Sequence, residues 1–273
     1  MNLSDRFQHF RSTVLLPAID ALAVLAWGVL LFKYWLGGQL RLLINPSYFG
    51  LVLAASLFLL LLGGIKSWQW FRRLRNPRSQ VQAQEILQHI TLFPAGWGSG
   101  LLLLVALLGF FFSPMVLTSQ MALQRGVSES LPPTQVQAQS FRSQTKPEER
   151  SLIEWVRTLN AYPEPDAYAG QPAKITGFVI HLPQLPENYI LLSRFIITCC
   201  AVDARPVGLP VKLDQNRNAY PPDTWLEVQG TMAVENLPVD SQTMRGTPTE
   251  KRQLVLVAKS VRVIPTPADP YVN

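Results

Sequence analysis

Three long segments that are almost free of charge constrain the fold of this chain more than any other feature. Residues 12–32 carry one charged side chain, Asp20, whereas residues 42–65 and 97–117 carry none. About 20 apolar residues in a helix cross the hydrocarbon core of a bilayer, and an isolated segment in lipid satisfies its backbone only as a helix. We therefore expect three transmembrane helices, over about residues 14–36, 46–65 and 96–117, in a membrane module of residues 1–117.

The net charge is unevenly distributed between the two halves of the chain. The 273 residues carry a formal charge of +6, which could indicate a nucleic-acid or membrane-surface partner. Residues 1–117 hold nine basic and three acidic side chains, and residues 118–273 hold 15 of each. Because the second half is neutral, we expect the lipid bilayer as a partner and no nucleic acid. The two cysteines are adjacent, which excludes a disulfide-framework fold.

Basic residues in the short loops predict the orientation of the membrane module. The connection between the second and third segments has one acid, Glu85, and five basic residues, namely Lys66, Arg72, Arg73, Arg75 and Arg78. Such loops remain on the cytoplasmic side. We therefore expect a cytoplasmic N-terminus and an extracytoplasmic second half. A cleaved signal peptide is the alternative for the first segment, but Asp20 interrupts its apolar region and no small-residue cleavage site follows.

Two features inside the apolar segments are candidates for function. An ionisable group at membrane depth, here Asp20, is a functional candidate by default. The alternative places Asp20 near the interface, hydrated and beside Arg11. The glycines at 96, 98 and 100 include one G-x-x-x-G spacing, and Gly63-Gly64 ends the second segment. Small residues permit close helix contact, so these positions predict contact with a partner helix.

The second half reads as a linker, a helix and a small β domain. Residues 118–146 are rich in Gln, Ser and Pro and predict a flexible linker. Residues 147–162 predict a helix that docks through Trp155. Within a domain of residues 170–268 we expect five strands, at Ala173–His181, Tyr189–Cys200, Pro206–Leu213, Thr224–Val234 and Gln253–Ile264. Gly177 and Gly230 suggest bulges or tight bends.

Five strands with a long second strand favour an OB-like barrel, with a small β-sandwich as the alternative. The predicted fold class is therefore an α+β membrane protein, in which three transmembrane helices precede an extracytoplasmic OB-like β-barrel.

The densest polar segment is Arg194–Ala204. Strand alternation puts Cys199 on the core face with Tyr189, Leu191, Phe195 and Ile197, and puts Arg194, Thr198 and Cys200 on the other. The two thiols would then point apart. One interpretation is a metal site formed by Cys199, Cys200 and Asp203, with His181 as a further ligand. The other is structural, with Cys199 buried, Cys200 partly exposed, and an Arg194–Asp203 ion pair bracing the turn.

No enzymatic motif stands out. The three histidines, at 9, 89 and 181, fall in different parts of the predicted topology. No Gly-rich phosphate loop follows a strand, and no Ser/His/Asp set is persuasive. We therefore do not expect an enzyme.

The segment RFIITCCAVDARPVGLPV, preceded by AKITGFV and followed by TWLEVQGTM, resembles the YcgQ-like family of permease subunits. This family comprises bacterial membrane proteins with a C-terminal domain of unknown function. The resemblance implies an inner-membrane accessory subunit whose partner is a multi-span permease of the YraQ-like family. It also suggests a metal or metalloid solute, and zinc as a candidate cofactor. The competing hypothesis is a membrane-tethered metal-binding or thiol redox module that uses Cys199 and Cys200.

Overall fold

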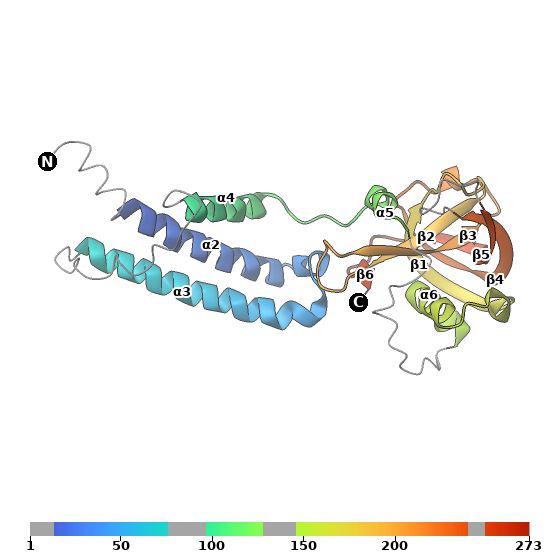
Figure 1. Ribbon diagram of the computed structural model, residues 1–273, viewed down its shortest axis with the longest axis horizontal. Helices are drawn as coiled ribbons and strands as arrows, with labels where there is room; N and C mark the ends of the chain where they lie inside the picture. Colours follow the sequence, from blue (N-terminus) through green and yellow to red (C-terminus); the bar gives the residue numbers. More distant parts are fainter. Residues whose placement is uncertain (1–13, 76–96, 128–145, 240–248, 273) are drawn as a thin grey trace. The chain divides into compact units, whose positions relative to one another are not determined.

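The computed structural model describes residues 14–75, 97–127, 146–239 and 249–272. The chain divides into two compact units, Met1–Met115 and Val116–Asn273. The first unit is helical and the second contains a six-stranded sheet (Figure 1). The architecture is therefore α+β, as the sequence predicts.

The described residues of the first unit form three α-helices. They are α2 (Leu16–Leu36), α3 (Phe49–Arg75) and α4 (Trp97–Phe111), and α2 packs against both of the others. The helical stretches Leu16–Leu36 and Pro46–Arg75 are long and apolar enough to cross a membrane by length and composition. The 15 residues of α4 would rise only about 22 Å, less than the hydrocarbon core. Two candidate spans are therefore present among the described residues, and the third is not confirmed.

Glycines bring the helices of this unit close together. A Cβ on Gly28 would lie 2.9 Å from Leu60 Cγ, and one on Gly63 would lie 2.6 Å from Leu25 Cδ2. On α4, a Cβ on Gly109 would lie 2.7 Å from Leu30 Cδ2. By contrast, Gly98 has no neighbouring atom within 4 Å of such a Cβ, and Gly96 lies outside the described residues. The close contacts described here are thus made at glycines outside the predicted G-x-x-x-G spacing.

Replacing Gly63 by isoleucine should destabilise the pair α2 and α3. The new side chain would overlap Leu25, and overpacking of this kind typically costs about 1–3 kcal/mol. The matched control is Gly64→Ile, because a Cβ at Gly64 meets nothing within 4 Å. Thermal unfolding of the full chain in detergent should show a lower midpoint for Gly63→Ile than for Gly64→Ile, and equal midpoints would contradict the packing described.

The described residues of the second unit form six strands. They are β1 (Pro172–Ile180), β2 (Tyr189–Ile196), β3 (Arg205–Lys212), β4 (Trp225–Val239), β5 (Thr249–Val263) and β6 (Tyr271–Val272). The hydrogen-bonded order is β1-β4-β5-β3-β2-β6, and β1 also pairs with β2. The first five strands therefore pair in a closed cycle, β1-β4-β5-β3-β2-β1. All are antiparallel except β3 with β5, and β6 joins β2 in parallel.

Gly177 and Gly230 lie where strands bend or change partner. The β4–β5 register shifts between Gln229 and Gly230, and a Cβ on Gly230 would lie 2.0 Å from Val257 O. At Gly177, where β1 leaves β4 and approaches β2, a Cβ would lie 2.6 Å from Ser193 O. The irregularity predicted at Gly230 is confirmed, and Gly177 marks a close approach of two strands.

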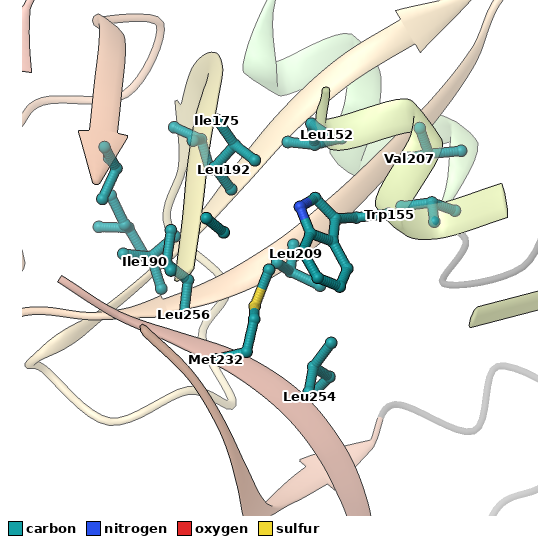
Figure 2. Packing of buried hydrophobic residues seen from close by; sticks show 14 of the residues in the cluster. Leu152, Trp155, Ile175, Ile190, Leu192, Val207, Leu209, Met232, Leu254 and Leu256 are labelled. Carbon is teal, nitrogen blue, oxygen red and sulfur yellow. The ribbon is translucent and has the colours of Figure 1, made fainter. Parts of the chain in front are cut away.

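The core of this unit forms where α6 (Leu152–Ala161) meets the strands (Figure 2). Ser151 and Glu154 form a capping box that starts α6, with Ser151 Oγ accepting from Glu154 N at 3.2 Å. Trp155 is completely buried among side chains that include Leu209 and Met232. The docking role predicted for Trp155 is therefore confirmed, although the α-helix begins five residues after Pro147.

Both faces of β2 are buried. The side chains predicted to face the core are buried at Tyr189, Leu191, Phe195 and Ile197, and Phe195 stacks on Phe178 with ring centroids 5.4 Å apart. The opposite face is buried as well, because Ile190, Leu192 and Ile196 belong to the main hydrophobic cluster. Both faces of β2 are apolar, so alternation alone could not distinguish them.

Two elements of the second unit differ from the sequence predictions. A helix, α5 (Ser119–Arg125), lies in the predicted linker, with Ser119 and Ala122 buried. Its start is capped by Thr118 Oγ1, which accepts from Met121 N at 3.4 Å. Strand β6 lies beyond residue 268, the predicted end of the β domain. Residues 119–125, which were predicted to belong to a flexible linker, are therefore helical. Residues 128–145 of the predicted linker lie outside the described part of the chain.

Candidate functional site

The candidate site is the turn that follows β2, defined here as the cysteine turn, residues 197–204. β2 ends at Ile196, four residues earlier than predicted. The Asp203 carboxylate explains the end of the strand, because it accepts from three successive backbone N–H groups. The distances are 3.2 Å from Thr198 N, 2.8 Å from Cys199 N and 3.3 Å from Cys200 N. These groups therefore bond to a side chain instead of a neighbouring strand.

The two thiols lie together on this turn. Cys199 is exposed and Cys200 is half-buried, and both are free. Their sulfur atoms are 3.6 Å apart. The expectations of a buried Cys199 and of thiols pointing apart are therefore wrong, because both depended on the strand continuing through Cys200. The structure presents a vicinal dithiol at the surface of the described part of the unit.

The thiol of Cys199 is held in its protonated form. Its hydrogen bond with the Asp203 carboxylate is the largest cause that raises the pKa of Cys199 to about 11, and the bond with Cys200 adds to it. Partial burial raises the pKa of Asp203, but the thiol and backbone hydrogen bonds lower it more, and its pKa falls below the usual range. At neutral pH the turn therefore pairs a neutral thiol with a carboxylate.

Arg194 does not brace the turn through Asp203, contrary to the structural interpretation of the sequence. Its Nη2 donates to Asp269 O at 3.2 Å, and its guanidinium lies 5.4 Å from the centroid of the Trp225 ring. The Nε atom is buried without a hydrogen-bond partner among the described residues. Burial lowers the pKa of this guanidinium from its ordinary value. Asp203 is already used by the backbone of the turn, which explains why the expected ion pair is absent.

His181 is remote from the thiols. It follows β1, and Ile180 pairs with Leu191 near the start of β2, whereas the cysteine turn follows the other end of that strand. Its Nε2 lies 2.9 Å from Tyr220 O. A strand advances about 3.3 Å per residue, so most of the length of β2 separates His181 from the thiols. His181 therefore cannot join Cys199 and Cys200 as a ligand.

The cysteine turn does not fit a structural zinc site. Such a site takes four protein ligands. The turn offers two sulfurs, and the Asp203 carboxylate is engaged by three N–H groups and a thiol. No group of three or more His, Cys, Asp or Glu side chains that could hold a metal ion is found among the described residues. Cys199, Cys200 and Asp203 as metal ligands therefore remain a sequence prediction.

Asp20 forms a polar cluster in the first unit. Its Oδ2 pairs with Lys66 of α3, and its Oδ1 accepts from Ser99 Oγ of α4 at 3.1 Å. The partner expected from the sequence, Arg11, lies outside the described residues. Asp20 thus links three helices and is satisfied within the chain.

Sequence reasoning missed three residues that hold the segment around α5, and one of them, Arg125, contacts the cysteine turn. Arg125 of α5 donates through Nη1 to Ala201 O at 3.1 Å and to Ala204 O at 2.6 Å. Tyr271 of β6 pairs with Phe195 and accepts through its hydroxyl from Leu117 N at 2.8 Å. Asp223 accepts from Ser119 N. The nearest of them, Asp223, lies 23 residues after Cys200 in the sequence, so no local pattern signals them.

Two family models match the chain. The DUF1980 N-terminal domain matches residues 19–128, and the DUF1980 C-terminal domain matches residues 135–273. No curated protein matches the chain. The name YcgQ-like, inferred from the cysteine segment, is not confirmed by these matches. The C-terminal match spans the cysteine turn and all six strands of the sheet. The chain therefore belongs to the DUF1980 family and carries both of the domains that define it.

Proposed function

We propose that this chain is an accessory subunit of a bacterial membrane permease complex. The observation that carries the proposal is the outward-facing apolar surface of the candidate spans. Only 22% of the most apolar window of Leu16–Leu36, and 11% of that of Pro46–Arg75, is buried inside the described chain. These surfaces suit lipid and the helices of a partner.

The charged groups of the described helices favour a supporting role over independent transport. Asp20 pairs with Lys66, and Lys33 donates to Phe110 O at 3.2 Å. A transport path needs polar groups that a solute can engage, usually near the middle of the membrane. Here the groups stabilise contacts between helices of the same chain. A multi-span partner, for which the sequence resemblance suggests a YraQ-like permease, would supply the path.

For the second unit we propose an OB-like barrel. Support comes from the cycle of pairings β1-β2-β3-β5-β4-β1, with β3 and β5 parallel, over five strands. A Greek-key barrel of five strands has no free edges apart from its short gaps. The basic last turn of α3, with Arg72, Arg73 and Arg75, supports a cytoplasmic location for that helix end. The barrel would then lie outside the plasma membrane, with a cytoplasmic N-terminus.

Co-purification tests this proposal. The full chain, carrying an affinity tag and expressed at its natural level in its own host, should be isolated from native membranes together with a multi-span permease. Paired substitutions on outward apolar positions of α3, such as Leu57→Ala and Leu61→Ala, should weaken the association, since both side chains are exposed in the single chain. Isolation of the chain without any permease under mild detergent conditions would contradict the proposal.

A second candidate function is a membrane-tethered module that uses the vicinal dithiol. The exposed Cys199, with its sulfur 3.6 Å from that of Cys200, favours it. Because the turn supplies two sulfurs, a bound soft metal would need further ligands from a partner or from water. Metal analysis of the purified chain, with Cys200→Ser as the control, tests this candidate. Stoichiometric metal that is lost in the variant supports it, and metal-free protein contradicts a resident metal.

A further inference from the structure

The cysteine turn is tied to the segment that enters the second unit. This segment, residues 117–125, includes α5 and is held at three points. Leu117 N donates to Tyr271, Ser119 N donates to Asp223, and the side chain of Arg125, at the end of α5, donates to the cysteine turn. A helix of seven residues is too short to persist alone. Its order therefore depends on these contacts.

Arg125 is the direct link between α5 and the cysteine turn. One nitrogen, Nη1, donates to the carbonyls of both Ala201 and Ala204. These two carbonyls stay in reach only while the turn keeps its shape. That shape depends on Asp203, which binds three N–H groups of the turn and whose own N–H donates to Cys200 O at 3.0 Å. Disturbing the carboxylate would move the acceptors of Arg125.

The two thiols lie on the residues that hold this carboxylate. The sulfur atoms of Cys199 and Cys200 are 3.6 Å apart, and the backbone N–H groups of the same two residues donate to Asp203. Adducts on the two sulfurs are bulkier than the thiol protons that they replace, so they push the two side chains apart and turn these N–H groups away from Asp203.

We propose that the cysteine turn and α5 form a coupled switch, in which occupation of the Cys199–Cys200 pair by a thiol-directed ligand breaks the Arg125 contacts and loosens α5. The occupant is a soft electrophile that forms a bond to sulfur. The inference goes beyond the accessory role and does not depend on a permease partner.

Hydrogen–deuterium exchange on the full chain in detergent tests the switch, with methyl methanethiosulfonate as the probe. The thiolate sulfur attacks the sulfenyl sulfur of the reagent, a methyl disulfide forms on the cysteine, methanesulfinate leaves, and the thiol proton passes to solvent. Full modification should raise amide exchange in residues 118–126 about 10-fold, the factor expected when one charge-assisted hydrogen-bond pair is lost. Reduction with dithiothreitol should reverse the change.

Two variants make the result specific. The double variant Cys199→Ser, Cys200→Ser should show no response to the reagent. Arg125→Gln should raise exchange in residues 118–126 without the reagent and remove its further effect. Amides of β4 should stay protected throughout, because β4 does not touch the turn through any of these contacts. Full modification without a change in residues 118–126, or with equal loss of protection in β4, would overturn the switch.

Discussion

Replacing Trp155 by alanine should lower the free energy of unfolding of the second unit by about 3–5 kcal/mol, the usual range for a fully buried aromatic residue. The side chain is completely buried, and its ring packs edge-on against Tyr168 with centroids 6.1 Å apart. The loss combines the transfer of a large apolar side chain to water with the cavity that it leaves. Urea titration of the full chain in detergent, read by pulse proteolysis of the second unit, measures the change.

Two controls accompany this variant. Tyr162→Ala, at the end of the same helix, removes a side chain that is 62% exposed and should change the free energy by less than about 0.5 kcal/mol. Trp155→Phe keeps most of the buried ring and removes an Nε1 donor that lacks a partner among the described residues, so its cost should be less than half that of alanine. An alanine variant as stable as Tyr162→Ala would contradict the core described here.

Replacing Asp203 by asparagine should make Cys199 react about 10-fold faster with a maleimide at pH 7.5. Loss of the carboxylate should lower the pKa of Cys199 from about 11 toward its ordinary value of 9.0. The thiolate fraction then rises about 100-fold. Lowering the pKa by these two units also makes the thiolate itself about 10-fold less nucleophilic. The net increase in the alkylation rate is therefore about 10-fold.

The measurement compares alkylation rates in a Cys200→Ser background, so that a single thiol reports. Asp214→Asn is the matched control, since it removes the same charge from a different loop of the same unit. As the pH rises, the rates of the Asp203 and Asp203→Asn proteins should become equal at about pH 10 and then cross, because the more basic thiolate of the Asp203 protein is the more nucleophilic once it has formed. Equal rates at pH 7.5 would show that the carboxylate does not hold the thiol proton.

The sequence predicted the two longest candidate spans and the number of main strands because these depend on local patterns. Uncharged runs of sufficient length identified α2 and α3, and short apolar runs between turn residues identified β1–β5. Element ends were less accurate. β2 ends at Ile196 because Asp203, seven residues later, captures the N–H groups of the turn, a competition that β-propensity cannot show.

The candidate site was only partly predictable. Sequence reasoning selected Cys199, Cys200 and Asp203, and the structure brings these three together. It paired Arg194 with Asp203 and considered His181 as a ligand, whereas strand topology places both with other partners. The support from α5 and β6 came from segments distant in sequence, and contacts of this kind depend on tertiary packing.

We propose that the second unit, with its dithiol, lies outside the membrane while the N-terminus is cytoplasmic. Because Cys199 and Cys200 are the two cysteines of the chain, a membrane-impermeant maleimide reports the location of the turn directly. In intact cells at pH 8.5, we expect labelling equal to that in permeabilised cells, and no labelling of the Cys199→Ser, Cys200→Ser variant. Labelling that requires permeabilisation would contradict the proposed orientation.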